Sequence, residues 1–525
     1  MRKLLLIIVL VLSACAKPVE EVKRLTVEEL KVLLKDTSAD GFTDDVSSAY
    51  SLFPIAFADS NGDGKGDLQG IINQLDYLND NNPETNTDLG IDAVWLNPIY
   101  PSDTYHKYDI NDYKAIDPAF GTIDDFKNLI TEANKRGIKI ILDMVFNHTS
   151  DTNPWFLKAI GGVEPFDEYY HVYTKIKLSD YPGSVGWYGR NSRMYYAGFW
   201  IEMPDLNLES ELVRNELKSV LDFWLDLGVS GFRFDAAQHV YDPNEYPKGT
   251  NLMVKNKQFW MEMKNYVKSK SPDTYLVAEI WESTSSNAPY APGFDSLFNF
   301  ELAGNIVAAV MSGNSSKLLS SYQNAMKILG TKTDHYTDAI FLTNHDQDRI
   351  MSQLDGDVDK AKLAANILFT MPGIPFIYYG EELGMQGIKP DEYIREPFIW
   401  DGTLDIPNAD WEVGKYNLNL DPYSVQVSHP DSMFNTYRTL IALRKGSQVL
   451  RYGDFVSLDI STSRVIAYSR TYNSQKWIIL HNLNSSTQTV SLSEQGTIIY
   501  QHKASTFIDG VIELSPQSTL IIEVN

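Results

Sequence analysis

The sequence predicts an α/β protein built on a (β/α)8 TIM barrel, with an inserted subdomain after the third strand and a C-terminal all-β sandwich. Between about residues 45 and 445, eight short apolar runs alternate with amphipathic stretches. Such alternation is typical of a parallel sheet whose two faces are covered by helices. A long interval rich in aromatic residues and glycine follows the third run, and short alternating runs replace this pattern near the C-terminus.

The eight apolar runs are the predicted barrel strands. They lie at residues 50–58, 93–98, 139–146, 231–236, 275–280, 294–300, 340–343 and 375–379. Helical spacing of apolar residues, as at 123–134 and 212–227, predicts the helices between them. We assign residues 44–148 and 209–445 to the barrel, 149–208 to the inserted subdomain and 446–525 to the sandwich.

The first 14 residues have the pattern of an export signal. Arg2 and Lys3 precede an apolar stretch at 4–12 that is too short to span a bilayer. The segment Leu12-Ser-Ala-Cys15 resembles the bacterial lipobox, which implies cleavage before Cys15 and a lipid on its sulfur. We expect an exported protein anchored to the cell envelope, in the periplasm or at the cell surface. The alternative is an ordinary signal peptide with a chance cysteine.

The predicted anchor is followed by a tether at residues 15–43. Thr26 and Glu29 have the spacing of a capping box, which predicts a short helix within the tether. No other segment has the length of apolar sequence that a membrane-spanning helix needs.

Composition limits the classes of partner. The chain has 525 residues with one cysteine, which excludes an internal disulfide and any metal site built from several thiolates. Its 45 basic and 69 acidic residues give a net charge of -24, which argues against nucleic acid as a partner. We expect a monomer that binds neutral molecules or cations.

Polar residues follow four of the predicted strands. Because the carboxyl ends of barrel strands meet on one face, these residues should form a single cleft. They are Asp143, Asn147 and His148 for the third strand, Arg233 and Asp235 for the fourth, Glu279 for the fifth, and His345 and Asp346 for the seventh.

Four segments that carry these residues resemble, in order, the four motifs of the α-amylase family of glycoside hydrolases. They are Asp143-Met-Val-Phe-Asn-His148, Gly231-Phe-Arg-Phe-Asp235, Val277-Ala-Glu-Ile-Trp281 and Phe341-Leu-Thr-Asn-His-Asp346. Residues 90–98 resemble the family's second-strand motif, and 203–207 resemble the motif near the end of its inserted subdomain. The resemblance extends from about residue 45 to 525.

The resemblance implies a retaining hydrolase that cleaves α-1,4 bonds of starch-type glucans and maltooligosaccharides. Asp235 would be the nucleophile that forms a covalent glycosyl-enzyme, and Glu279 would be the general acid and then the base. Asp346 would stabilise the transition state and hold sugar hydroxyls. Retaining hydrolysis needs two carboxyls about 5–5.5 Å apart with different protonation states.

Further residues are expected to bind substrate. Arg233 lies two residues before Asp235 on the same strand, so it should point to the same side and keep that carboxylate ionised. The resemblance implies that His148 and His345 hydrogen-bond the sugar at the cleavage point. It also implies that Tyr108 stacks beneath the sugar ring.

The position of cleavage along the glucan chain is less constrained by the sequence. Asp109 and Arg349 match residues that hold the terminal glucose in the family's exo-acting α-glucosidases, although the two could instead pair with each other. His239, which could contact the sugar beyond the cleavage point, and the Met203-Pro-Asp205 segment favour α-amylase. Gln238 stands where α-amylases often carry lysine.

We therefore favour an α-amylase. The alternatives are an exo-acting α-glucosidase or oligo-1,6-glucosidase, a transglycosylating enzyme and a non-catalytic glucan-binding lipoprotein.

Calcium is the expected cofactor. The segment 59–67 places oxygen side chains at alternate positions with glycines between them, as loops that wrap hard cations do. Counted from Asp59, the twelfth position is Gly70 and not the glutamate of an EF-hand loop, which excludes an EF-hand. Similar loops in the family imply the ligands Asp59, Asn61, Asp63, Asp67 and the carbonyl of Lys65; the alternative is a metal-free turn.

A second calcium site is implied at Asn147, Asp205 and His239, which match ligands between barrel and inserted subdomain in many α-amylases. The alternative is that these three residues only form hydrogen bonds across that seam.

Overall fold

The computed structural model describes residues 42–333, 336–403 and 405–525. The predicted export signal, Cys15 and nearly all of the tether lie outside these residues. Within the part that is described, no helix combines the length and apolar character needed to cross a membrane.

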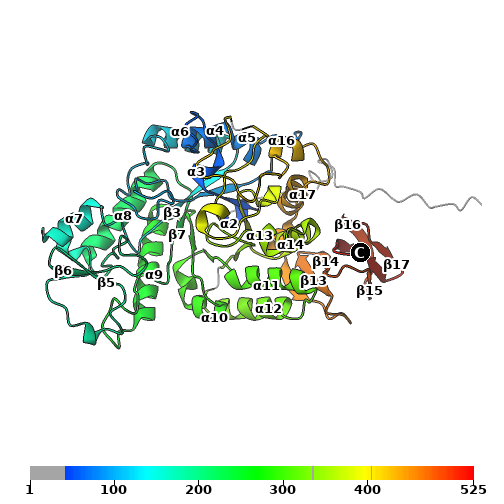
Figure 1. Ribbon diagram of the computed structural model, residues 1–525. Coiled ribbons are helices and arrows are strands. Elements are labelled where there is room, and N and C mark those ends of the chain that lie inside the picture. Colours follow the sequence, from blue (N-terminus) through cyan, green and yellow to red (C-terminus); the bar gives the residue numbers. More distant parts are fainter. Residues whose placement is uncertain (1–41, 334–335, 404) are drawn as a thin grey trace, which may run out of the picture.

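Eight parallel strands form the central barrel, and each matches one of the apolar runs, so the predicted barrel is confirmed (Figure 1). Their neighbour order is β10-β11-β1-β2-β3-β7-β8-β9, and a parallel bridge between Phe298 and Ala339 joins the two ends of the sheet. The strands are β1 (Ala49–Leu52), β2 (Ala93–Leu96), β3 (Lys139–Met144), β7 (Gly231–Phe234), β8 (Tyr275–Ala278), β9 (Ser296–Leu297), β10 (Ala339–Phe341) and β11 (Ile374–Tyr378).

Helices surround the barrel and bury apolar side chains against it. In α8 (Glu211–Asp226), for example, Val213, Leu217 and Trp224 are buried at intervals that bring them to one side. The other long helices are α6 (Ile123–Lys135), α9 (Leu252–Lys270), α11 (Phe300–Ser312), α12 (Leu318–Leu329), α14 (Val358–Thr370) and α17 (Met433–Lys445).

Short helices fill the connections. They are α2 (Phe42–Asp45), α3 (Pro54–Phe57), α4 (Leu68–Asn73), α5 (Leu75–Leu78), α10 (Thr284–Asn287), η3 (Ala288–Gly293), α13 (Ile350–Gln353), η4 (Glu381–Leu383), α15 (Asp391–Ile394), α16 (Tyr423–Gln426) and α18 (Gln448–Tyr452).

The alternation of side chains along each strand creates two separate cores. Ala93 and Trp95 of β2 belong to a cluster inside the barrel, whereas Val94 and Leu96 belong to the larger cluster under the helices. The same period of two turns Phe232 and Phe234 of β7 outward. Arg233, which lies between them, therefore points into the barrel.

The inserted subdomain leaves the barrel after β3 and returns before α8. It contains α7 (Pro154–Gly161), η1 (Phe166–Glu168), η2 (Leu178–Asp180) and a small sheet of β4 (Val172–Tyr173), β6 (Arg193–Tyr196) and β5 (Trp187–Arg190). A bridge between His148 and Asp205 joins its two ends, and a bridge between Tyr170 and Leu206 joins its middle to the segment that returns to the barrel.

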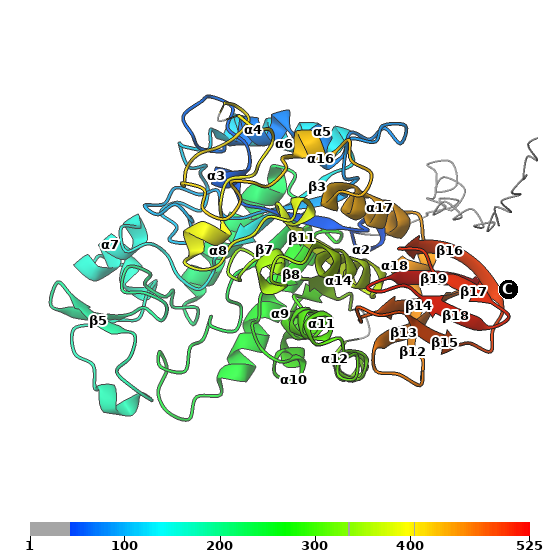
Figure 2. The ribbon, with the colours of Figure 1, turned by 45° about the vertical axis from the view of Figure 1, so that its right-hand side comes forward.

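The C-terminal region is a two-sheet β-sandwich, as predicted, and lies at the end of the barrel opposite the inserted subdomain (Figure 2). Apolar side chains such as Ile478, Leu480 and Ile512 form its core. One sheet has the order β12 (Asp454–Ser457), β13 (Val465–Tyr472), β14 (Gln475–Asn482), β19 (Thr519–Val524), β16 (Gly496–His502), and the other β15 (Gln488–Ser491), β18 (Val511–Leu514), β17 (Thr506–Ile508).

Candidate active site

Three carboxylates project at the carboxyl end of the barrel. Asp235 directly follows β7, Glu279 follows β8, and Asp346 lies in the loop after β10. The first two continue the ladder, because the Asp235 amide donates to the Met144 carbonyl and the Glu279 amide to the Phe234 carbonyl, both at 3.0 Å. Backbone register alone therefore aims Asp235 and Glu279 into one cleft.

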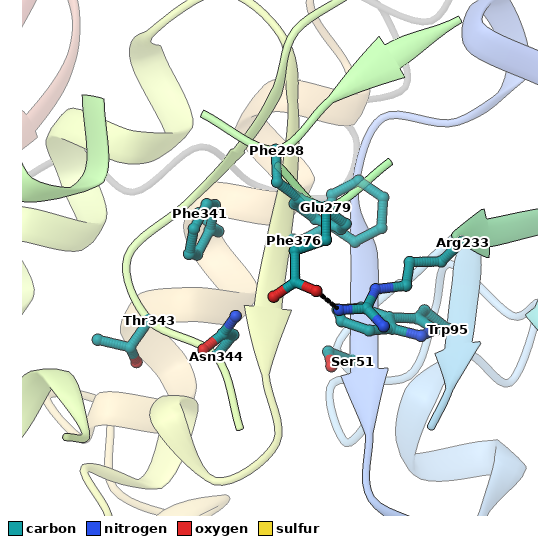
Figure 3. A pocket seen from close by; sticks show the side chains of 9 residues that line it. All are labelled: Ser51, Trp95, Arg233, Glu279, Phe298, Phe341, Thr343, Asn344 and Phe376. Atoms are coloured by element: carbon teal, nitrogen blue, oxygen red, sulfur yellow. Dashed lines mark ion pairs between the residues drawn. The ribbon is translucent and has the colours of Figure 1, made fainter. Parts of the chain in front are cut away.

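A single buried guanidinium joins the first two carboxylates. Arg233 pairs with Asp143 at 2.8 Å, with Asp235 at 2.7 Å and with Glu279 at 2.7 Å. Figure 3 shows the Glu279 carboxylate facing the Arg233 guanidinium, with Trp95 beside the guanidinium. The position of Arg233 beside Asp235 was predicted, whereas its ion pair with Glu279 was not.

Burial and charge set the ionisation of these acids. Burial raises the pKa of Glu279 to about 7, against the lowering effect of Arg233. Burial likewise raises the pKa of Asp235 to about 6, again opposed by Arg233. Since one cation faces several carboxylates, Glu279 is the member of the pair that holds its proton to higher pH.

Asp346 has a different environment. One of its carboxylate oxygens lies 3.1 Å from His345 Nε2, and the other accepts a hydrogen bond of 2.9 Å from Arg395. Burial opposes ionisation, but the neighbouring His345 and Arg395 bring the pKa of Asp346 below its usual range. Asp346 is therefore the carboxylate of the three that stays ionised most easily.

Tyr108 and His345 form one rigid unit. Their rings stack with centroids 5.5 Å apart and planes at 5°, and the Tyr108 hydroxyl lies 2.7 Å from His345 Nε2. Asn97 holds both, with its amide 3.0 Å from that hydroxyl and 3.2 Å from His345 Nδ1. Burial lowers the pKa of His345 to about 3, so its imidazole is neutral and able to accept or donate one hydrogen bond.

The two other predicted histidines lie on either side of an exposed aromatic ring. Phe199, from the inserted subdomain, lies 5.3 Å from His148 and 5.2 Å from His239 between ring centroids. His148 is buried, whereas the His239 side chain is 39% exposed and pairs with Asp242 at 3.4 Å. The structure thus places His239 at the rim of the cleft.

Asp109 and Arg349 do not pair with each other in the described structure. Asp109 accepts hydrogen bonds from the Ser102 hydroxyl, at 2.6 Å, and from Thr104. Arg349 is buried, donates to the Tyr379 carbonyl at 2.7 Å and packs against the rings of Tyr378 and Tyr379. The alternative of an Asp109–Arg349 ion pair is therefore wrong, and their predicted contact with sugar stays a prediction.

Comparison with known proteins decides the family. Residues 51–453 match the model of the α-amylase catalytic domain. The chain belongs to the α-amylase family of glycoside hydrolases. Residues 465–521 also match the model of the C-terminal domain of the α-amylase SusG.

Several members of the family resemble this chain over nearly its whole length. Alpha-amylase 3 of Dictyoglomus thermophilum is 39% identical over 482 residues, which cover 90% of this chain and 92% of that protein. The crystal structure of an α-amylase from H. orenii has a TM-score of 0.85 and 36% identity, covering 92% of this chain and all of that one. A glucan 1,6-alpha-glucosidase of Streptococcus pneumoniae is 31% identical over 84% of this chain and 92% of its own.

The loop at residues 59–67 turns tightly at two of its glycines. Gly62 and Gly64 have φ of 80° and 85°, which lets the chain wrap around its own side-chain oxygens. Asp59 accepts hydrogen bonds from the amides of Gly62, at 2.7 Å, and Gly64, at 2.8 Å. Asp67 caps helix α4 through the Gly70 amide.

The oxygen donors of this loop, including Asn61, Asp63 and the Lys65 carbonyl, fit a hard cation in their chemistry. Even so, no set of three or more His, Cys, Asp or Glu side chains in the described ranges is arranged to hold a metal.

At the predicted second calcium site, hydrogen bonds cross the seam. The Asn147 amide donates to Asp205 at 3.2 Å, and the Leu206 amide donates to the Asn147 carbonyl. His239 turns to Asp242 instead. These bonds match the alternative drawn from the sequence. The Asn147 side-chain carbonyl is buried without a hydrogen-bond partner among the described residues, and burial raises the pKa of Asp205 to about 7.

Arg395 was missed by the sequence analysis. It lies after β11, donates to Asp346 and to the His345 carbonyl, both at 2.9 Å, and bonds the Tyr105 hydroxyl at 2.9 Å. No motif marked it, and the available signal was only that the loops after all eight strands meet on this face.

Removal of the Arg395 charge should lower the activity of the enzyme. In Arg395→Met, the pKa of Asp346 should rise because its cation is lost, and the Asp346 carboxylate should no longer be held in place by a hydrogen bond. Activity at pH 6 on a chromogenic maltooligosaccharide should fall by about a hundredfold. The control Arg464→Met, on an exposed part of the sandwich, should leave the activity unchanged. Activity close to wild type in Arg395→Met would show that Asp346 does not depend on Arg395.

Proposed function

We propose that this protein is an α-amylase that hydrolyses α-1,4 bonds of starch-type glucans and maltooligosaccharides with retention of configuration. The observation that carries the proposal is the sharing of one guanidinium, Arg233, by Asp235 and Glu279. Two carboxylates on one guanidinium lie close together, as the roughly 5–5.5 Å spacing of retaining enzymes requires.

The environments of the two carboxylates suit opposite roles. Asp235, with the lower pKa, is the nucleophile that attacks the anomeric carbon and forms the glycosyl-enzyme. Glu279, whose pKa of about 7 keeps it protonated in mild acid, donates its proton to the departing glycosidic oxygen. It then takes a proton from the water that releases the sugar.

Asp346 and the Tyr108–His345 unit hold the sugar ring while this happens. Asp346, kept ionised by Arg395, stabilises positive charge on the ring and accepts hydrogen bonds from its hydroxyls. Neutral His345 contributes one hydrogen bond, and the half-exposed Tyr108 ring offers an apolar face to the sugar. His148 and His239 bind on the Phe199 side.

Incubation with soluble starch and with maltotriose, with products separated over time, tests this function. The wild type should release mixed maltooligosaccharides from starch at early times. Release of glucose alone from chain ends would identify an α-glucosidase, as the 31% identity to a glucan 1,6-alpha-glucosidase allows.

Loss of the proposed acid should abolish hydrolysis while binding remains. Glu279→Gln keeps the shape of the side chain but removes the proton donor, so kcat should fall by about a thousandfold. The matched control Glu282→Gln, three residues on and exposed, should retain full activity. A near-normal rate in Glu279→Gln would refute the assigned role of Glu279. Absence of cleavage by both wild type and Glu282→Gln would refute the proposed hydrolase activity.

The pH dependence of kcat/KM on maltotriose should be bell-shaped. Asp235 must be ionised, so activity should fall as pH drops below about 6. Glu279 must be protonated, so activity should also fall as pH rises above about 7. Because the two acids interact through Arg233, the measured limbs belong to the pair. A rate still rising at pH 8 would contradict these assignments.

Calcium is proposed as the structural cofactor, held by the loop of Asp59, Asn61, Asp63, Asp67 and the Lys65 carbonyl. Its charge would neutralise carboxylates that form no ion pair in the described structure and accept hydrogen bonds from backbone amides and, at Asp67, from Ser60 and Asn61. We also propose Asn147, Asp205 and His239 as a second site, supported by the buried Asp205.

Calcium should therefore raise the thermal stability of the protein. Addition of calcium after chelation should raise the midpoint of thermal unfolding by about 2 °C or more. Asp63→Asn, a change at an exposed loop position, should remove part of this shift, whereas Asp273→Asn, at an exposed position outside the loop, should not. A midpoint that chelator and calcium leave unchanged would contradict the cofactor.

A further inference from the structure

Two loops from different barrel strands meet beside Asp346. Tyr105, in the loop after β2, stacks on Trp411, in the loop after β11, with centroids 4.8 Å apart and planes at 24°. In the sheet β1 lies between β2 and β11, and Phe53, just after β1, packs against both rings from below. The stack therefore bridges the carboxyl end of β1.

A single side chain, Arg395, connects this aromatic stack to the carboxylate of Asp346. Arg395 donates from one nitrogen to Asp346 and from another to the Tyr105 hydroxyl, both at 2.9 Å. The other carboxylate oxygen of Asp346 faces His345. Asp346 thus lies between the sugar-binding unit of His345 on one side and the Tyr105–Trp411 stack on the other.

The stack is fixed in place. Trp411 covers one face of Tyr105, Phe53 meets its ring at 61°, and Arg395 holds its hydroxyl. Tyr105 therefore has little free surface on which a sugar could lie flat.

The Trp411 loop is also anchored by its backbone. The Asp59 amide donates to the Pro407 carbonyl at 3.0 Å, and the Asp410 amide donates to the Gly64 carbonyl at 2.8 Å. These bonds join it to the loop at residues 59–67. Both half-buried rings thus belong to a rigid wall.

We propose that the Tyr105–Trp411 stack is an end wall that limits how many glucosyl units bind on the non-reducing side of the cleavage point. The inference rests on the proposed function. Because Glu279 protonates the departing group, the reducing side lies toward Glu279, and Asp346 holds the ring that remains. A wall beyond Asp346, on the Arg395 side, therefore lies on the non-reducing side of that ring. The wall favours binding in which the non-reducing end of the chain lies a few glucosyl units from the cleavage point, so the oligosaccharides released from starch are short.

A matched pair of chromogenic maltoheptaosides tests the wall, one of them blocked at its non-reducing end by a 4,6-O-ethylidene group. Wild type should cleave the blocked substrate about tenfold more slowly than the free one. Trp411→Ala should raise the ratio of blocked to free rates by about tenfold. The control Val413→Ala, at a side chain 81% exposed in the same loop, should leave the ratio at the wild-type value.

The outcomes separate the wall from the function on which it rests. Equal rates on both substrates in wild type, or a ratio that Trp411→Ala leaves unchanged or lowers, would overturn the wall. Failure of wild type to cleave either substrate would instead overturn the proposed function. If thermal unfolding shows that Trp411→Ala does not fold, Trp411→Leu and Tyr105→Ala serve as second variants and must raise the ratio in the same direction.

Discussion

The buried charge of Arg233 is the interaction around which the site is organised. A guanidinium with no solvent contact must be neutralised by neighbouring groups, and Asp143, Asp235 and Glu279 surround it. The same contacts fix the two carboxylates at the cleft floor. Because one positive charge serves three acids, complete ionisation of all three is unfavourable, which leaves a proton for Glu279. The buried charge of Arg233 therefore both holds these carboxylates in place and sets which of them keeps a proton.

A second arginine, Arg395, stabilises the charge of the third carboxylate, Asp346. Arg395 pairs with Asp346 as Arg233 pairs with the other two carboxylates, and it reaches the site from the loop after β11. The result is a set of acids with separate ionisation behaviour within one cleft. Arg395 also ties the catalytic floor to Tyr105, so the chemistry and the shape of the cleft share a support.

The barrel interior explains why these charges can be buried. Beside the carboxylates, Trp95, Phe298 and Phe376 fill much of the barrel interior with aromatic rings (Figure 3). The low polarity of this floor strengthens the ion pairs above it and raises the pKa of the acids. Substitution of these rings by smaller side chains would therefore weaken the ion pairs and lower the pKa values of the acids without changing any catalytic residue.

The sequence by itself determined the barrel, the inserted subdomain, the sandwich and the identity of the residues at the strand ends. Those features depend on local rules: apolar runs make strands, and a period of two turns Arg233 and Asp235 to the same side. The meeting of Arg395 with Asp346 and of Tyr105 with Trp411, and the burial of Arg349 behind Tyr379, were decided only by the tertiary structure. These contacts join loops from strands far apart in the chain, and their partners depend on how the closed barrel brings those loops together.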